Sequence, residues 1–402
     1  MLEKYAELLV KQGVNLQPGQ ELVIDSSIEC FELVRAVAKV AYEVGAKDVI
    51  VNYTDEKISR LRYENCDIEH FATIPQYIIE LKNQYALKHA AVLSITSSDP
   101  EAMKGIDPLK IQTYRKALKT ACSTFYDHLD LGIDRWCIAG APSVAWANKV
   151  FPDMSDKEAV NALWQAIYKV TRCNQDNPIE AWNEHRHSFE KRVQILNEKK
   201  IKSLHYTNQL GTDLTIGMNK GYLFAGGGSY TTDGIYSFPN IPTEEIFNRQ
   251  IKIKLMELFI VLCHNLMEIL LMNFLLLLKG RIVDYMQRRL RVLKSIIETD
   301  EGSHYLGEVA LVPYASPIRE LGILFYNTLF DENASCHLAI GRGFSECIEN
   351  GLEMNKEQLF EKGINDSLTH VDFMIGTKDL SIVATLENGE EFVVFENGNY
   401  AF

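Results

Sequence analysis

The sequence predicts an α/β domain with a mainly parallel sheet, followed by a mixed α+β domain. Two observations support this fold class. Up to about residue 200, short apolar runs alternate with stretches of helical periodicity, which is typical of a parallel sheet covered by helices. Beyond that point short strand-like runs dominate, beginning with LHYTNQLGTDLTIGM. We therefore expect domains at residues 1–200 and 201–402.

The first strand is expected in ELVID, which begins at Glu21 after the turn QPGQ. A helix from about Phe31 to Val44 follows, and it ends at Gly45, the residue type favoured just beyond a helix. Further strands are predicted in DVIVNYTD, AAVLSITSS and RWCIAGAPS. Because neither GxGxxG nor GxxxxGK[ST] follows the first strand, we expect no nucleotide cofactor in this half.

Two long helical patterns between about Ser155 and Lys202 lead the chain out of the first domain. His185 and His187 lie among charged residues in the second pattern. We therefore expect both histidines on a solvent-exposed helix face.

Composition excludes some classes of protein. With 402 residues, 47% of them hydrophobic, the chain can build a sizeable core. A formal charge of -13 argues against nucleic-acid binding, which requires a basic surface. The eight cysteines form no CxxC pair, and the N-terminus MLEKYAELLVKQG is an amphipathic helix rather than a signal peptide. A cytoplasmic protein with reduced thiols, and no membrane association, is therefore expected.

Acidic residues and histidines recur in three short motifs of the second half. These motifs are GEVALVP, FDENASCHLAIG and THVDFMIG, and they contain Glu308, Glu332, His337, His370 and Asp372. The alternation in HVDF predicts a strand with His370 and Asp372 on one face. One face can then present an imidazole and a carboxylate to a single ion.

Each of these residues alone is more typical of an ordinary core or surface position. Their conjunction favours a metal site, because acids that interrupt apolar strands are costly to bury unless they are paired or metal-bound. Glu332 and His337 are five residues apart, so this is not the i, i+4 histidine pair of a helical zinc protease. The mixed nitrogen and oxygen set suits zinc, cobalt or manganese. The second domain is thus predicted to bind metal.

Several motifs together carry a family resemblance. They are QPGQELVID, VAYEVGAKDVIVNY, MKGIDPLKI, VFPD, GTDLTIGM, NIPTEEIF, GEVALVP, FDENASCHLA and SLTHVDFMIG. The chain resembles the thermophilic-type metalloaminopeptidases, the aminopeptidase T, aminopeptidase S and PepS group, from its first helix to ENGNYAF with one interruption. The resemblance implies two divalent metal ions in the C-terminal domain and a cytoplasmic homodimer that removes N-terminal residues from peptides.

The resemblance also implies a set of site residues. The implied metal ligands are Glu245 of the PTEEIF motif, Glu308 as a bridging carboxylate, Glu332, His337, His370 and Asp372. Placement of the PTEEIF motif decides between Glu244 and Glu245, and we favour Glu245. Glu244 is then a candidate to move a proton to the leaving amine or to hold the substrate amine. Its alternative role is an exposed acid in a loop.

Two departures from the family pattern bear on activity. The residue seven positions after the histidine ligand is commonly Tyr in this group, and here it is Phe344. A phenol can donate a hydrogen bond to an oxyanion, whereas a phenyl ring cannot, and losing such a donor costs about 10²-fold or more in rate.

The second departure is an anomalous apolar stretch at residues 248–280. From Leu255 to Leu278, ten of twenty-four residues are Leu, and Gly, Pro and Asp are absent. A transmembrane helix has the right length but would contain Glu257 and Glu268. A buried helix inserted by this protein is a second interpretation. We favour a third, a pair of compensating reading-frame shifts in the gene or its record, because the family pattern is lost and recovered abruptly.

The sequence therefore predicts an enzyme, a metal-dependent aminopeptidase that acts through water activated by two metal ions. The main alternative is a catalytically impaired homologue that keeps the fold and binds metal or peptide. A second alternative is metal-dependent oxidation of an aromatic ring, which a related branch of this fold is thought to perform with iron.

Overall fold

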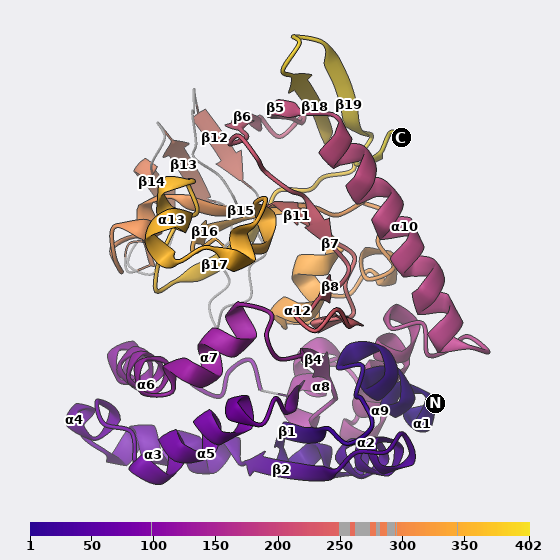
Figure 1. Cartoon of the computed structure of the whole chain (residues 1–402), viewed down its shortest axis with the longest axis vertical. Helices are drawn as coiled ribbons and strands as arrows, with labels where there is room; N and C mark the ends of the chain where they lie inside the picture. Colours follow the sequence, from indigo (N-terminus) through magenta and orange to yellow (C-terminus); the bar gives the residue numbers. More distant parts are fainter. Residues whose placement is uncertain are drawn as a thin grey trace. The chain divides into compact units, whose positions relative to one another are not determined.

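The computed structural model describes residues 1–97, 99–248, 258–261, 274–278, 282–287, 294, 296–343 and 345–402 (Figure 1). The chain divides into two compact units. The first contains residues 1–184 and 228–242, and the second contains residues 185–227 and 243–402. The domain boundary expected near residue 200 stays a prediction. The two units are not continuous in sequence, since residues 228–242, from the second half of the chain, belong to the first unit.

The first unit is built on a parallel sheet, as predicted. Its strands lie in the order β10-β4-β3-β1-β2, and every neighbouring pair is parallel. The strands are β1 (Glu21–Ser27), β2 (Asp48–Thr54), β3 (Ala91–Thr96), β4 (Trp136–Gly140) and β10 (Asn240–Ile241). The first four are the strands expected from the sequence. The fifth, β10, lies in residues 228–242 and is not predicted from the sequence. A short hairpin, β8 (Ser229–Tyr230) with β9 (Tyr236–Ser237), precedes it.

Helices connect the strands of the first unit. They are α1 (Leu2–Leu8), α2 (Phe31–Glu43), α3 (Glu56–Asn65), α4 (Ile68–Phe71), α5 (Gln76–Leu87), α6 (Pro108–Ala121), α7 (Ser123–Asp130), α8 (Val144–Val150) and α9 (Asp156–Val170). In α2 the buried residues Leu33, Val34, Val37, Val40 and Ala41 follow the i, i+3, i+4 spacing of a helix with one apolar face. The helix ends as predicted, since Gly45 adopts a φ of 95°.

The second unit contains antiparallel sheets, which confirms the predicted change of class. One sheet has the order β20-β19-β18-β5-β6, and another has the order β17-β16-β15-β11-β7. The first comprises β5 (Ile201–Thr207), β6 (Asp213–Gly217), β18 (Ser381–Leu386), β19 (Glu391–Glu396) and β20 (Asn399–Tyr400). The second comprises β7 (Ala225–Gly226), β11 (Ile246–Asn248), β15 (Leu306–Leu311), β16 (His337–Gly341) and β17 (His370–Met374). The helices are α10 (Pro178–Glu198), which starts in the first unit, α12 (Thr328–Asp331) and α13 (Lys356–Glu361).

Part of the apolar stretch at residues 248–280 is described, and it is β-structure. β12 (Leu258–Val261) pairs antiparallel with β13 (Phe274–Leu278), which pairs with β14 (Ile282–Gln287). A single helix over residues 255–278, buried or spanning a membrane, is therefore wrong. Among the described residues, no helix is long and apolar enough to cross a membrane. The rest of the stretch lies outside the described residues, and the reading-frame hypothesis stays a prediction.

Candidate metal centre

The sheet that contains β15, β16 and β17 has one apolar face and one polar face. Val309, Leu311, Leu338, Ile340 and Phe373 point into the core of the second unit. Because side chains alternate along a strand, the residues between them point to the other face. The other face therefore carries the acids and histidines of the three sequence motifs.

Strand register places Glu308 and Asp372 on either side of Ala339. Glu308 pairs with Ala339, and Ala339 pairs with Asp372, so all three point to the same face. His370 lies two residues before Asp372 on β17, the strand predicted from HVDF, and therefore shares that face. The small side chain of Ala339, which is fully buried, leaves room between the two carboxylates.

His337 joins the same face from the start of β16. It pairs with Ala310 on β15. Glu245 immediately precedes β11, whose Phe247 also pairs with Ala310. Because side chains alternate, residues 245 and 247 point to one face of the sheet. Glu245 therefore reaches the site from the β11 side of β15, opposite the side where β16 lies. Three strands of one sheet, and the residue just before a fourth, thus supply the candidate site.

A β-bulge places Glu308 on the polar face. Leu306 pairs with Ile340 and Glu308 with Ala339, so β15 advances two residues where β16 advances one. The extra residue is Gly307, and a Cβ atom there would lie 2.2 Å from the Gly341 carbonyl oxygen. Only glycine fits this close approach. The bulge lets Leu306 pack in the core while Glu308, two residues later, faces the site.

Five of the six predicted ligands form two groups that share one carboxylate. The ligand atoms of Glu245, Glu308 and His337 lie within 4.8 Å of one another. Those of Glu308, His370 and Asp372 do so as well. Glu308 Oε2 lies 3.0 Å from His370 Nε2, which is 3.2 Å from Asp372 Oδ1. His337 Nε2 lies 3.2 Å from Glu245 Oε2.

Both histidines are oriented by the backbone. His337 Nδ1 is 3.0 Å from the Ser335 carbonyl oxygen, and His370 Nδ1 is 2.9 Å from the Arg342 carbonyl oxygen. A carbonyl oxygen only accepts a hydrogen bond, so each Nδ1 carries a proton and donates it. Each Nε2 is therefore directed at the carboxylates with its lone pair available to a cation, which is the usual outer-shell arrangement of a metal-bound histidine.

The centre holds an excess of buried negative charge. Glu308 and His337 are each 1% exposed, and Glu245 and Asp372 are also buried. Burial would lower the pKa of His337, but hydrogen bonding to Glu245 and the charges of Glu245, Asp372 and Glu308 raise it to about 10. Burial would likewise lower the pKa of His370, but the charge of Asp372, and hydrogen bonds to Asp372 and Glu308, raise it well above its ordinary value. Without a cation, the carboxylates thus draw protons onto both imidazoles.

Glu332 lies near the centre but belongs to neither group. It opens a short 3₁₀ turn, Glu332–Ala334, and is partly buried. Burial, and then the charges of Asp372 and Glu245, raise the pKa of Glu332 well above its ordinary value. The carboxyl group of Glu332 therefore interacts electrostatically with the acids of the centre.

Glu244 and His185 show where the sequence interpretation was incomplete. Glu244 is only 7% exposed, so the alternative of an exposed loop acid is wrong. His185, on α10, has a side chain that is 11% exposed, and its Nε2 lies 2.8 Å from the Thr243 carbonyl oxygen and 3.6 Å from Glu244 Oε2. The expected exposed position is wrong for His185 and confirmed for His187.

Asn333 was not predicted as a site residue. Its Oδ1 accepts a hydrogen bond of 2.7 Å from the Glu244 backbone N–H, and its Nδ2 donates to the Leu329 carbonyl oxygen. It is fully buried. Asn333 thereby fixes the backbone next to Glu245. Its position directly after Glu332 was the only signal in the sequence.

Two other features of the second unit complete the description. Phe344 lies outside the described residues, so its effect on rate stays a prediction.

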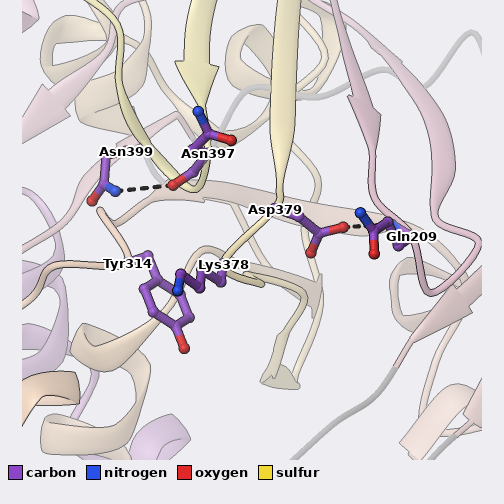
Figure 2. Close-up of a pocket in the computed structure, with 6 residues that line it drawn as sticks. All are labelled: Gln209, Tyr314, Lys378, Asp379, Asn397 and Asn399. Atoms are coloured by element: carbon purple, nitrogen blue, oxygen red, sulfur yellow. Dashed lines mark hydrogen bonds between the residues drawn. The ribbon is translucent and has the colours of Figure 1, made fainter.

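A separate polar pocket of about 570 Å³ is lined by Gln209, Tyr314, Lys378, Asp379, Asn397 and Asn399 (Figure 2). None of these six is a predicted ligand, and the Asp379 carboxylate already accepts a hydrogen bond from the Gln209 backbone N–H.

Comparison with known proteins identifies the family. The profile of the family described as thermophilic metalloprotease (M29) matches residues 1–400. The chain belongs to the M29 family. Aminopeptidase AmpS of Bacillus subtilis (strain 168) is 43% identical to this M29 chain over 408 residues, covering 100% of the chain and 98% of that relative.

Solved structures agree with the family assignment. Wild-type AmpT from Thermus thermophilus matches the M29 chain with a TM-score of 0.91 and 33% identity, covering 100% of this chain and 99% of that one. This confirms the predicted fold class. A 2,5-dihydroxypridine dioxygenase from Pseudomonas putida KT2440 matches with a TM-score of 0.51 and 11% identity, covering 100% and 96%, which shows a shared fold alone. The predicted family and the enzyme class, a metalloaminopeptidase, are confirmed.

Proposed function

We propose that this protein releases N-terminal amino acids from peptides through water activated by two divalent metal ions. One observation carries the proposal: the Glu308 carboxylate is common to two groups of acid and histidine side chains on one sheet face. A carboxylate has two oxygens, so a single Glu can contribute a ligand to each of two neighbouring ions. The M29 relatives named aminopeptidases support the substrate class.

The donor set fits such ions. Four acids, Glu245, Glu308, Glu332 and Asp372, accompany two imidazoles, His337 and His370. Carboxylate and imidazole ligands suit zinc, cobalt or manganese rather than metals that prefer thiolates. The orientation of both imidazoles, Nδ1–H toward a carbonyl and Nε2 toward the acids, agrees with this use. We propose these six residues as the ligands.

When bound, the ions supply Lewis acidity that lowers the pKa of a water molecule and polarises the scissile carbonyl. The protein residues hold the reactants. The rigid sheet fixes the ligands. Two divalent ions balance the charge of the four ligand carboxylates, so the further carboxylate of Glu244 supplies the negative charge that attracts the positively charged amine of a peptide N-terminus. This attraction favours cleavage next to a free N-terminus over cleavage within a chain.

Glu244 is proposed as the proton carrier. It is buried next to ligand Glu245, and its backbone is fixed by Asn333. Its carboxylate takes a proton from the attacking water and delivers it to the leaving amine nitrogen as the C–N bond breaks. The proton is thus transferred within the site, and the carboxylate is regenerated.

Matched peptides test the proposal. With metal added, we expect release of the first amino acid from a short peptide and no reaction with the same peptide acetylated at its N-terminus. Glu244→Gln should lower kcat by about 10²-fold or more while both metal equivalents remain bound. Equal cleavage of the acetylated peptide would refute an aminopeptidase, and unchanged turnover in Glu244→Gln would remove the proton carrier.

The same measurements address the impaired homologue. Phe344, in place of the Tyr common in the resembled group, favours this second candidate. It would bind two equivalents of metal, measured by elemental analysis, without releasing an amino acid from any peptide of a small panel. Homodimer formation and a cytoplasmic location remain proposals; light scattering of the purified protein tests the first.

A further inference from the structure

A second group of histidines and an acid lies in the first unit, among residues that the catalytic proposal does not use. The group is His89, His128 and Asp134. His89 precedes β3, and Asp134 precedes β4, the neighbouring parallel strand. Since Val92 pairs with Trp136, the amino ends of the two strands are adjacent. His128, in the last turn of α7, completes the group.

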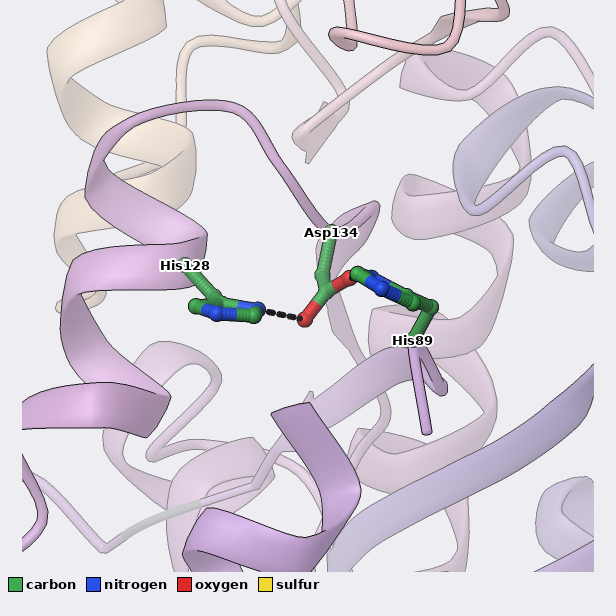
Figure 3. A group of neighbouring side chains, drawn as sticks. All are labelled: His89, His128 and Asp134. Carbon is green, nitrogen blue, oxygen red and sulfur yellow. Dashed lines mark hydrogen bonds and ion pairs between the residues drawn. The ribbon is translucent and has the colours of Figure 1, made fainter. Parts of the chain in front are cut away.

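The Asp134 carboxylate lies between the two imidazoles (Figure 3). His89 Nδ1 is 2.8 Å from Asp134 Oδ1, and His128 Nδ1 is 2.9 Å from Oδ2. The two rings are nearly parallel, with an interplanar angle of 22° and centroids 5.7 Å apart. One potential ligand atom from each of three separate segments therefore lies within 4.8 Å of the other two.

The carboxylate is buried, and no permanent cation neutralises it. The Asp134 side chain is 2% exposed. In the part of the chain that the structure describes, its ion-pair partners are the two histidines and no Lys or Arg. The neighbouring Arg135 is turned away toward Asp233 and Gln20. A buried carboxylate is costly unless it is paired with a cation or bound to a metal.

The backbone at His89 is a second, independent observation. Its φ is 53°, in the left-handed region. Ala90 N–H donates to the Tyr85 carbonyl oxygen and His89 N–H to that of Ala86, the two bonds of a Schellman motif ending α5. Glycine is the residue that adopts this position most readily. The left-handed residue that follows α5 is thus one with a metal-ligating ring, and its Nδ1 lies 2.8 Å from Asp134 Oδ1.

We propose that His89, His128 and Asp134 bind a zinc ion that links the end of α5 to the end of α7. Two imidazoles and one carboxylate are a set that zinc prefers. The side chain of His89 is 64% exposed, so water can reach the ion and fill a fourth position. The ion would join two connecting segments at the amino ends of the strands, with its fourth position open to water.

The geometry requires an adjustment of the side chains. In a tetrahedral zinc site the ligand atoms are about 3.3–3.4 Å apart, so the 2.8 Å contact between His89 Nδ1 and Asp134 Oδ1 must lengthen by about 0.5 Å, and His128, which now contacts Oδ2, must turn toward the same ion. The exposed imidazole of His89 can move by this amount. Ligation through Nδ1 also requires each neutral imidazole to carry its proton on Nε2 instead, a change of tautomer that solvent permits without net proton release.

Zinc titration of the full-length protein tests the site. Zinc is the probe, its stoichiometry is measured by elemental analysis after dialysis, and its affinity by competition with a chelator. His89→Asn is the informative variant, because Asn also tolerates the left-handed position and should leave the fold intact. His205→Asn is the matched control, since His205 forms a single exposed contact of 2.7 Å with Asp213.

We expect His89→Asn to lose one zinc equivalent, or to bind it at least a hundredfold more weakly, since loss of an outer-shell partner alone costs 10 to about 100-fold. Asp134→Asn should behave alike, and His205→Asn should match the parent. Aminopeptidase activity should persist in His89→Asn, so failure of this site is distinguishable from failure of the catalytic proposal. Parental zinc stoichiometry and affinity in both His89→Asn and Asp134→Asn would overturn the inference.

Discussion

Glu308→Gln should remove the stabilisation that metal gives the protein, while the metal-free protein stays nearly as stable as the parent. In the metal-free state the change removes repulsion from Glu245 and Asp372, whose ligand atoms lie within 4.8 Å. At an effective dielectric constant of 20, each ionised pair at that distance repels by about 3.5 kcal/mol. The change also removes attraction to His370 at 3.0 Å, about 5.5 kcal/mol on the same basis. These opposing energies nearly cancel.

In the metal-loaded state the energies do not cancel. Two ions at a concentration of 100 times Kd stabilise the folded protein by about 5.4 kcal/mol in total. If losing the shared ligand weakens both sites by about a hundredfold, about 0.8 kcal/mol remains. The difference of about 4.6 kcal/mol corresponds to roughly 9–18 °C in Tm for a unit of this size.

Scanning calorimetry with and without zinc, together with elemental analysis, measures the effect. Asp372→Asn is the matched comparison, because Asp372 belongs to one group only and should lose about half of the stabilisation. A Glu308→Gln protein that shows the full parental rise in Tm with zinc, or binds as many equivalents of metal as the parent, would show that the two groups do not share this carboxylate.

Three further substitutions have defined outcomes. Asn333→Ala should lower the free energy of unfolding by about 1–3 kcal/mol by leaving the buried Glu244 N–H without its acceptor, and should lower kcat; urea denaturation and peptide release measure both. Phe344→Tyr should raise kcat by up to about 10²-fold if position 344 contributes an oxyanion donor; an unchanged kcat would dismiss that role. Asp300 accepts hydrogen bonds from Ser303, Ser367 and Leu368, and although burial opposes this, they lower its pKa. The ionised carboxylate of Asp300 therefore stabilises the fold fully above the unfolded pKa of about 3.9, and this stabilisation is lost as pH falls through the lower folded value. Asp300→Asn should accordingly lower the free energy of unfolding at neutral pH, and the difference between variant and parent should become smaller at acid pH.

Local patterns explain why much of the fold was predictable. The strands beginning at Glu21 and Asp48 are apolar runs bounded by turns, and the helix between them ends at a glycine; these signals lie within a few residues of what they specify. The strand from His370 to Met374 followed from alternation alone. The conformation of each of these elements is determined by residues within the element or next to it.

Long-range contacts explain what was missed. β10 joins the first sheet beside β4, about a hundred residues earlier in the chain, and nothing in Asn240 or Ile241 indicates that partner. His185 is buried by its contacts with Thr243 and Glu244, although its sequence neighbours are charged. For the apolar run that contains β13, the sequence leaves a helix only as an alternative to the favoured reading-frame shifts, and it does not suggest a strand, because a short apolar run fits a buried helix and a buried strand equally well.

The site residues fall between these cases. Glu308, His337, His370 and Asp372 could be selected from residue type and spacing, but their ordering into two groups depends on the pairing of β15, β16 and β17. That pairing also explains why Glu332, which lies in a turn outside the strands, is near the centre without joining either group. Residue type suggested the chemistry, and strand register decided the geometry.

The bulge at Gly307 decides on which face of the sheet Glu308 lies. In a regular strand Leu306 and Glu308 would share a face, and Glu308 would point into the apolar core as an unpaired charge. A side chain at position 307 would meet the Gly341 carbonyl oxygen at 2.2 Å and would oppose the bulge. Among relatives of this chain, replacement of Gly307 should therefore be selected against more strongly than replacement of its neighbours, whereas loss of that residue would leave Leu306 and Glu308 on opposite faces.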